Sequence, residues 1–393
     1  MRQSASPERS PAALPAPTGR PFAGGVPLDG SWSPLRIGIV APPWYPIPPK
    51  GYGGIEWMIY WLAEALAARG HEVTVIGAGG SRTSANFIPT YEDPPFRRIG
   101  ESLPEVLHAL AAAEALDDLR VDVVHDHCLA GPLTAARRRV PTVLTAHGPL
   151  DGEVRRYYEM LSDSLSLVAI SDCQRRKAPD LHWAGMVHNA VPVDEYPFQS
   201  RKEDFCLFLG RMNAEKAPEL AIEVARRAGY PIVIAAKCNE PPEKRYFEER
   251  VRPLLGPDAH WFGEANTAQK KDLLARARCL VFPIQWDEPF GIVMVEAMAC
   301  GTPVVAPRRG SVPEVVEDGV TGFICDDTDE LPWAIVKVDE LEPKLCRQHV
   351  AEHFDVSNMV AGYEAVYRGV ARTAPSHERW RIYAAPSSKR LTS

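Results

Sequence analysis

Two glutamates, Glu288 and Glu296, are separated by seven residues in the segment EPFGIVMVE. Pro289 suits the first turn of a helix and Gly291 leaves room for a ligand, so a helix starting at Phe290 and Gly291 offers backbone donors to a phosphate or sugar oxygen. At ~1.5 Å per residue the carboxylates stand roughly 8–12 Å apart along the helix, which suits the diols of an elongated nucleotide-sugar. A glycosidase pair is the competing interpretation. Taken alone, one exposed and one core glutamate would explain the segment.

Two cations follow an expected strand in the sequence LGRMNAEK: Arg211 and Lys216, beside Gly210. Arginine supplies a forked set of donors and lysine a point charge, a combination that suits a diphosphate. Surface ion pairs with Glu215 and Glu219 are the alternative.

A glycine-rich loop carries Gly51, Gly53 and Gly54 directly before an expected helix. Glycines let the backbone approach a ligand, and the first N–H groups of a helix face an anion. A dinucleotide fingerprint would need its glycines immediately after the strand, whereas about a dozen residues intervene here. The loop therefore argues against NAD, and a flexible loop without a ligand explains the glycines equally well.

Three histidines lie near expected strand ends: His125 and His127 in VVHDHC, and His147 in TAHGPL. A single histidine at a strand end is more often structural than catalytic. His147 stands out because a glycine follows it at the top of a strand. His125 and His127 lack an evident third ligand, so we expect no metal site.

The elements that must position these groups follow a βα pattern. A helix is expected where Ile55, Met58, Ile59, Leu62 and Leu66 share one face. The expected strands are 35–41, 71–77, 121–125, 142–146 and 167–170, then 205–209, 232–236, 260–262, 279–282, 303–306 and 322–324. This pattern predicts an α/β protein with two doubly wound, Rossmann-like domains and a ligand cleft between the carboxyl ends of their sheets.

The expected boundaries follow from shifts in composition. Residues 1–34 form a Pro-rich leader that we expect to be disordered. The remaining segments are an N-terminal acceptor-side domain at 35–190, a hinge at 191–200, a C-terminal nucleotide-sugar domain at 201–355, a helix at 356–375 that crosses back to the first domain, and a tail at 376–393.

Composition excludes several classes. The net charge of −7 disfavours a nucleic-acid-binding protein, and no apolar run reaches the roughly 18 to 20 residues of a membrane helix. The eight cysteines lack metal-ligand spacing, which suits reduced thiols in the cytoplasm.

The order of these motifs resembles the retaining glycosyltransferases of family 4, which have the GT-B fold. The segment EPFGIVMVEAMACGTPVVA is similar to their E-x7-E signature, and GSVPEVVEDGVTGF follows it in the expected place. The resemblance covers about residues 35–370. One departure is the hinge, where Asn189, Ala190 and Val191 replace the common N-G-V.

The resemblance implies a role for each matching position. Catalytic roles are implied for His147, near the primary hydroxyl side of the donor sugar, for Arg211 and Lys216 on the leaving diphosphate, and for Glu288 on the transferred sugar. Donor-binding roles are implied for Gly53, Gly54, Gly210, Phe290, Gly291, Ile292 and Glu296, the last on the ribose diol. No cofactor or metal is implied, because cations stabilise the leaving charge.

The expected function is a retaining transfer of a hexose from a nucleotide-sugar, UDP-glucose first and GDP-mannose second, to a saccharide, glycolipid or small-molecule hydroxyl. Alternatives are a GT-B epimerase or phosphorylase, or a non-catalytic nucleotide-sugar-binding protein. Trp44, Tyr45, Tyr157 and Tyr158 are candidates to stack on the acceptor, with ordinary packing at least as good an explanation. Arginine clusters at 137–139 and 155–156 suggest transient contact with a membrane surface, although two short clusters on an acidic protein are more often simply solvated. The sequence does not indicate the oligomeric state.

Overall fold

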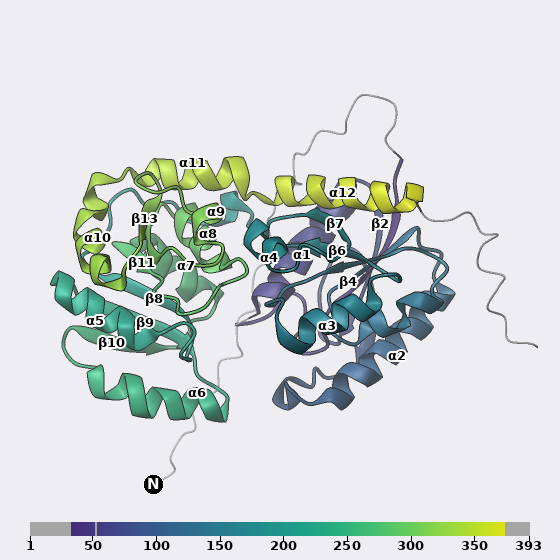
Figure 1. The fold of residues 1–393 in the computed structure, drawn as a ribbon, viewed down its shortest axis with the longest axis horizontal. Helices are drawn as coiled ribbons and strands as arrows, with labels where there is room; N and C mark the ends of the chain where they lie inside the picture. The colour runs from purple at the N-terminus through teal and green to yellow at the C-terminus, as the bar shows by residue number, and fades with distance from the viewer. Residues whose placement is uncertain (1–32, 52, 374–393) are drawn as a thin grey trace, which may run out of the picture.

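The computed structural model describes residues 33–51 and 53–373, which form two α/β halves joined side by side (Figure 1). The predicted leader lies almost wholly outside the described residues, as does the predicted tail. The first half holds a seven-stranded parallel sheet of order β3-β2-β1-β4-β5-β6-β7. Its strands are β1 (Arg36–Val40), β2 (Glu72–Ala78), β3 (Asn86–Tyr91), β4 (Val123–Asp126), β5 (Thr142–Thr145), β6 (Ser166–Ala169) and β7 (Trp183–Met186).

The second half holds a six-stranded parallel sheet of order β10-β9-β8-β11-β12-β13. Its strands are β8 (Cys206–Arg211), β9 (Ile232–Lys237), β10 (Ala259–Gly263), β11 (Cys279–Val281), β12 (Val304–Pro307) and β13 (Gly322–Cys325). In both sheets the order reverses beside the first strand, at β1/β4 and at β8/β11. Ligands of open α/β sheets bind at such reversals, outside the carboxyl ends of the strands.

Helices cover both sheets. Those of the first half are α1 (Gly54–Ala68), α2 (Ser102–Asp118), α3 (Gly152–Leu161) and α4 (Asp172–Lys177). Those of the second half are α5 (Pro218–Ala228), α6 (Pro241–Tyr246), α7 (Thr267–Arg276), α8 (Ile292–Ala299), α9 (Val312–Val315), α10 (Leu331–Lys337) and α11 (Pro343–His353). The inner strands are short apolar runs buried on both faces, as a helix-covered parallel sheet requires.

The last helix, α12 (Val356–Thr373), leaves the second half and lies along the first (Figure 1). It packs against α1 and β7, and its Tyr363 and Tyr367 are fully buried. Because one hydrophobic cluster runs from the first sheet through α12 into the second half, the two halves share part of their core.

Candidate active site

A cleft of about 990 Å³, including its open mouth, lies between the two halves. The first half contributes the glycine loop and α1. The second half contributes the ends of β8 and β9, together with α7 and the start of α8. The predicted residues that line the cleft are Gly53, Gly54, Gly210, Arg211, Lys216, Glu288, Gly291, Ile292 and Glu296.

Glu288 lies in the loop before α8 and is 9% exposed. Its carboxylate accepts a hydrogen bond from Trp286 Nε1 at 3.0 Å and forms an ion pair with Lys216 Nζ. Gly291 has φ 71°, and a Cβ there would come within 2.8 Å of Met294 Cε, so this turn favours glycine. The helix begins at Ile292, one or two residues after the predicted start, and the side chain of Phe290 packs in the core.

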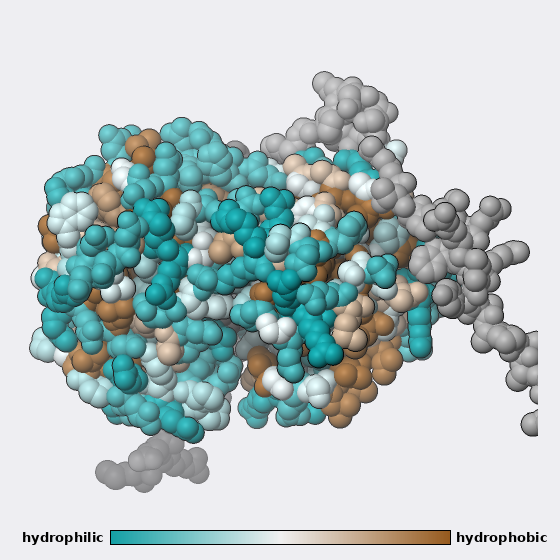
Figure 2. Space-filling model, in the orientation of Figure 1, coloured by the Kyte–Doolittle hydropathy of each residue, from teal (hydrophilic) through white to brown (hydrophobic). Residues whose placement is uncertain are grey.

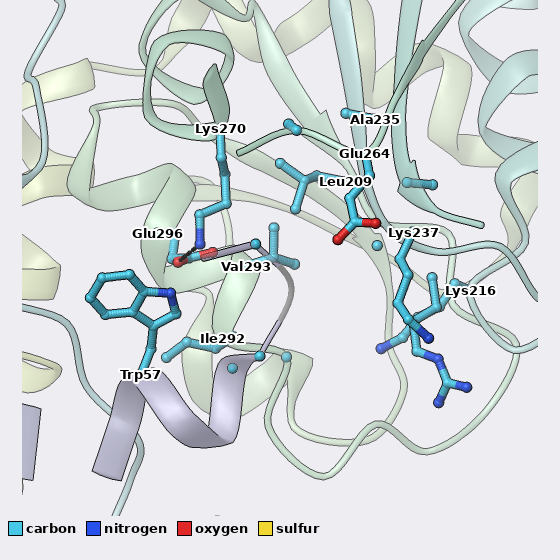
Figure 3. Close-up of a pocket in the computed structure, with 18 of the residues that line it drawn as sticks. Trp57, Leu209, Lys216, Ala235, Lys237, Glu264, Lys270, Ile292, Val293 and Glu296 are labelled. Carbon is cyan, nitrogen blue, oxygen red and sulfur yellow. Dashed lines mark hydrogen bonds and ion pairs between the residues drawn. The ribbon is translucent and has the colours of Figure 1, made fainter. Parts of the chain in front are cut away.

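Glu296 lies in the second turn of α8 and is 4% exposed. It accepts a hydrogen bond from the Tyr196 hydroxyl at 2.8 Å and pairs with Lys270 Nζ of α7. Figure 3 shows Lys270 directed at Glu296 on one side of the cleft, with Lys216 and Lys237 on the other. Each of the two signature carboxylates therefore has its own lysine.

Arg211 and Lys237 end adjacent strands, β8 and β9, and share two acidic partners. Arg211 Nε donates to Glu243 Oε1 at 3.3 Å and its guanidinium lies 3.8 Å from Glu240. Lys237, 5% exposed, pairs with the same two glutamates. Burial opposes the charge of Glu243, but backbone N–H groups and these cations outweigh it and lower its pKa.

The glycine loop approaches the second half closely. Gly53 caps α1 with φ 148°, and a Cβ there would lie 2.8 Å from Pro49 Cγ. A Cβ at Gly51 would lie 3.1 Å from Glu264 Oε1, and one at Gly54 3.6 Å from Ile292 Cγ2. Larger residues here would narrow the cleft, and no side chain caps the N-terminus of α1.

The three histidines form a network behind the cleft. His127 Nδ1 lies 2.9 Å from His147 Nε2, and His125 contacts the Tyr367 hydroxyl of α12 at 2.7 Å. Burial lowers the pKa of His147 to about 4 and lowers that of His125 and His127 as well. His147 is half-buried and is not among the residues that line the cleft. Within residues 33–51 and 53–373, no three His, Cys, Asp or Glu side chains gather as a metal site.

Three of the four aromatic candidates for the acceptor side, Trp44, Tyr157 and Tyr158, are engaged within the first half. Trp44 Nε1 donates to Glu105 of α2 at 3.0 Å, and the Tyr157 hydroxyl bonds to the carbonyl of Leu129. Tyr158 is buried in the core under α3. Burial, with Glu56 nearby, raises the pKa of Tyr45 to about 12.

Both halves match known families. Residues 52–182 match the family described as Glycosyltransferase Family 4, and residues 194–350 match Glycosyl transferases group 1. The chain belongs to the family 4 glycosyltransferases and has the GT-B fold.

Relatives of this transferase agree with that assignment. The D-inositol 3-phosphate glycosyltransferase of Mycolicibacterium smegmatis is 28% identical over 383 residues, covering 82% of this chain and 87% of that protein. The glycogen synthase of Mycobacterium tuberculosis is 25% identical over 399 residues, covering 86% and 95%. Among solved structures, AviGT4, a glycosyltransferase involved in avilamycin A biosynthesis, is 25% identical with a TM-score of 0.67, covering 86% of this chain and 98% of its own. Sucrose-phosphate synthase from Thermosynechococcus elongatus shares the fold with a TM-score of 0.74 at 18% identity, covering 86% and 100%.

Sequence analysis of the transferase missed two cleft lysines, Lys237 and Lys270. Lys237 ends a predicted strand next to that of Arg211, so its place at the cleft could have been inferred from sheet order. Lys270 follows the capping box of Asn266 and Gln269, which marks a helix start. Nothing local indicates that this helix faces Glu296.

Proposed function

We propose that this glycosyltransferase moves a hexosyl unit from a nucleoside diphosphate sugar to a hydroxyl acceptor, with UDP-glucose as the first expected donor and GDP-mannose as the second. The observation that carries the proposal is a single cleft holding Arg211, Lys216 and Lys237 beside Glu288 and Glu296. The cations suit a diphosphate, and the carboxylates can accept from hydroxyls at the two ends of the donor.

Each signature carboxylate is paired with a lysine. We propose that Glu288 exchanges part of its contact with Lys216 for hydroxyls of the transferred sugar, while Lys216 turns to the phosphate. Glu296, held by Tyr196 and Lys270, accepts from the ribose diol. The pairing holds both carboxylates in place for the donor, which reduces reorganisation during the reaction.

The reaction breaks the bond between the anomeric carbon and a phosphate oxygen and forms one to the acceptor oxygen. Positive charge develops on the sugar ring and negative charge on the leaving diphosphate, so the three cations stabilise the transition state most. We propose front-face substitution with retention, in which the leaving phosphate oxygen takes the acceptor's proton. With the cations in this role, the enzyme requires no metal.

The acceptor is proposed to be a hydroxyl of a saccharide, a glycolipid or a small-molecule aglycone, reached from the first half. The relatives, a D-inositol 3-phosphate glycosyltransferase and a glycogen synthase, favour a polyol or saccharide hydroxyl within this range. The enzyme is proposed to act in the cytoplasm, which agrees with its eight cysteines, all of which are free thiols.

Transient contact with a membrane surface is also proposed, and it rests on exposed apolar side chains because two of the clustered arginines are engaged in ion pairs. Arg138 is buried against Asp126, and Arg155 pairs with Glu159 and Asp180. Exposed apolar side chains instead gather on the first half (Figure 2, lower right) and include Phe96, Leu103, Leu107, Leu110 and Leu133. In the described part of the chain, no helix is both long enough and apolar enough to cross a bilayer.

A panel of UDP-, GDP-, ADP- and TDP-sugars tests the function, scored for thermal stabilisation and for slow release of nucleotide, with and without EDTA. One donor that stabilises the protein and is hydrolysed in EDTA supports a metal-independent transferase and identifies the donor. Stabilisation without release, whatever the acceptor, would indicate a binding protein. No stabilisation of the folded protein by any donor would overturn the proposal.

A further inference from the structure

A carboxylate of the second half caps a helix of the first. Glu314 of α9 accepts hydrogen bonds from the backbone N–H groups of Asp172 at 2.7 Å and Cys173 at 2.5 Å, the first two residues of α4. Ser171 Oγ accepts from the third free N–H group, that of Gln174. Two of the three N–H groups in the first turn of α4 thus find their acceptor on a residue of the other half.

Within the second half, the residues next to Glu314 are bonded to the loop that carries Glu288. Ser311 N donates to the carbonyl of Glu288 at 3.0 Å, and Ser311 Oγ donates to the carbonyl of Phe290 at 2.8 Å. A Cβ at Gly310 would come within 2.4 Å of Glu288 N, so the two backbone segments are in direct contact. Movement of α9 must then move the loop that carries Glu288.

On the other side, α4 holds the loop that carries His147. The Gln174 amide Nε2 donates to the carbonyls of Ala146 at 2.8 Å and Gly148 at 2.7 Å, on either side of His147. Its Oε1 accepts from Ile170 N at 2.9 Å, and the side chain is 2% exposed. Gln174 therefore fixes this loop to α4.

These contacts form one continuous connection from Glu288 to His147, two residues on opposite halves that the family resemblance assigns to the same sugar. We infer that Glu314 and Gln174 are positioning residues for the transfer, which set the two halves of the sugar site against each other when the domains close. The expected loss of kcat rests on the proposed function. The expected effect on how closely the two halves are held together rests on the contacts alone.

The electrostatics of Glu314 favour this role. Burial opposes its charge, but His188, whose Nε2 lies 3.5 Å away, and the two α4 N–H groups outweigh burial and lower the pKa of Glu314. The carboxylate is thus ionised at neutral pH, where a negative charge at a helix N-terminus is favourable.

A second contact across the same boundary supplies a matched control. Lys177, at the end of α4, lies 2.7 Å from Asp287, and both side chains are at least one-third exposed. Exposed ion pairs contribute little, and Lys177 makes no side-chain contact with either sugar-site loop beyond that pair. Lys177→Ala should change turnover by less than about twofold.

The test compares Glu314→Ala, Glu314→Gln and Lys177→Ala in the full-length enzyme with its identified donor. Glu314→Ala should lower kcat about 10- to 100-fold, because two hydrogen bonds to a charged group are lost, while nucleotide affinity stays within about twofold. Glu314→Gln keeps one acceptor oxygen and should recover part of the loss. Equal losses in kcat and nucleotide affinity, or no loss in kcat, would overturn the inference.

Gln174→Met, of similar volume, tests whether both residues belong to one connection. Combined with Glu314→Ala, it should lower kcat no further than the worse single variant, whereas additive losses would show two independent roles. Small-angle scattering of the nucleotide-bound wild type and Glu314→Ala separates the two proposals. A larger radius of gyration for the variant supports the connection even if no donor is turned over, and an unchanged radius contradicts it.

Discussion

The two walls of the cleft handle charge differently. In the second half, carboxylates are paired with cations: Glu288 with Lys216, Glu296 with Lys270, and Glu243 with Arg211 and Lys237. In the first half, burial moves the titratable groups behind the cleft toward their neutral forms, as the raised pKa of Glu56 and the lowered pKa values of His125, His127 and His147 show. The second wall thus presents charged groups to a ligand, whereas the first wall is backed by groups that burial keeps neutral. This difference suits the proposed diphosphate donor and hydroxyl acceptor.

The largest effect should come from the paired carboxylate nearest the transferred sugar. Glu288→Ala removes the proposed acceptor of sugar hydroxyls and leaves Lys216 without its carboxylate, so kcat/KM should fall by roughly 100-fold or more. Steady-state rates with the identified donor measure the loss. Asp287→Asn is the matched control, an adjacent exposed carboxylate that should cost less than about threefold. Equal losses for both would remove Glu288 from the sugar site.

A smaller loss is expected at the diphosphate. Arg211→Ala should lower kcat/KM about 10- to 150-fold, because one charge-assisted contact to the leaving group is lost while Lys216 and Lys237 remain. Arg227→Ala removes an exposed arginine paired with Asp329 and controls for charge alone. A loss below twofold for Arg211→Ala would show that the donor wall does not depend on this cation.

The sequence predicts the inner, buried strands better than the outer strands of the first sheet. Each strand of the second half and five of the seven in the first were predicted, because they are short apolar runs. The two missed strands, β3 and β7, are the outer strands of their sheet and carry weaker patterns. Strand β3 is only half-buried and contains Pro89, which an edge strand tolerates.

The donor wall was predictable because its groups lie next to strand ends and a helix start. Arg211 ends a strand and Glu288 precedes α8, so local rules place both at the cleft. The environment of His147 was not predictable, since it depends on His127, which follows strand β4, and on Gln174 of α4. The roles of Trp44 and Tyr157 depend likewise on α2 and on the Leu129 backbone.

A titration can test whether the first wall disfavours charge. Burial raises the pKa of Glu56 to about 7, from the ordinary 4.5 of a glutamate. Above pH 7 the folded state carries a buried charge, which lowers the free energy of unfolding; as pH falls toward 4.5 the folded carboxyl protonates first and that cost disappears. Glu56→Gln should therefore raise Tm by a few degrees at pH 8, with the difference vanishing near pH 4.5.

Thermal melts across this pH range measure the effect. Glu72→Gln, at an exposed position of β2, controls for removal of a charge as such. If Glu56→Gln lowered Tm at pH 8, Glu56 would be a stabilising anion, and the contrast between the two walls would fail at this residue.

The smallest effect should come from the acceptor side. Trp44→Ala removes a ring proposed to stack on the acceptor and should raise the acceptor KM about two- to tenfold. Slow hydrolysis of the donor without acceptor should stay unchanged, because Trp44 does not line the donor cleft. Trp44→Phe keeps a ring but loses the hydrogen bond to Glu105, so it separates stacking from packing.

Glu288→Ala and Arg211→Ala should slow both sugar transfer and donor hydrolysis, whereas Trp44→Ala should weaken only the use of the acceptor. This difference in kinetics would distinguish the two walls of the cleft. If Trp44→Phe raises the acceptor KM as much as Trp44→Ala, the hydrogen bond to Glu105 positions the loop and the ring does not contact acceptor. If neither variant changes the acceptor KM, Trp44 is a packing residue. The acceptor would then be bound elsewhere on the first half.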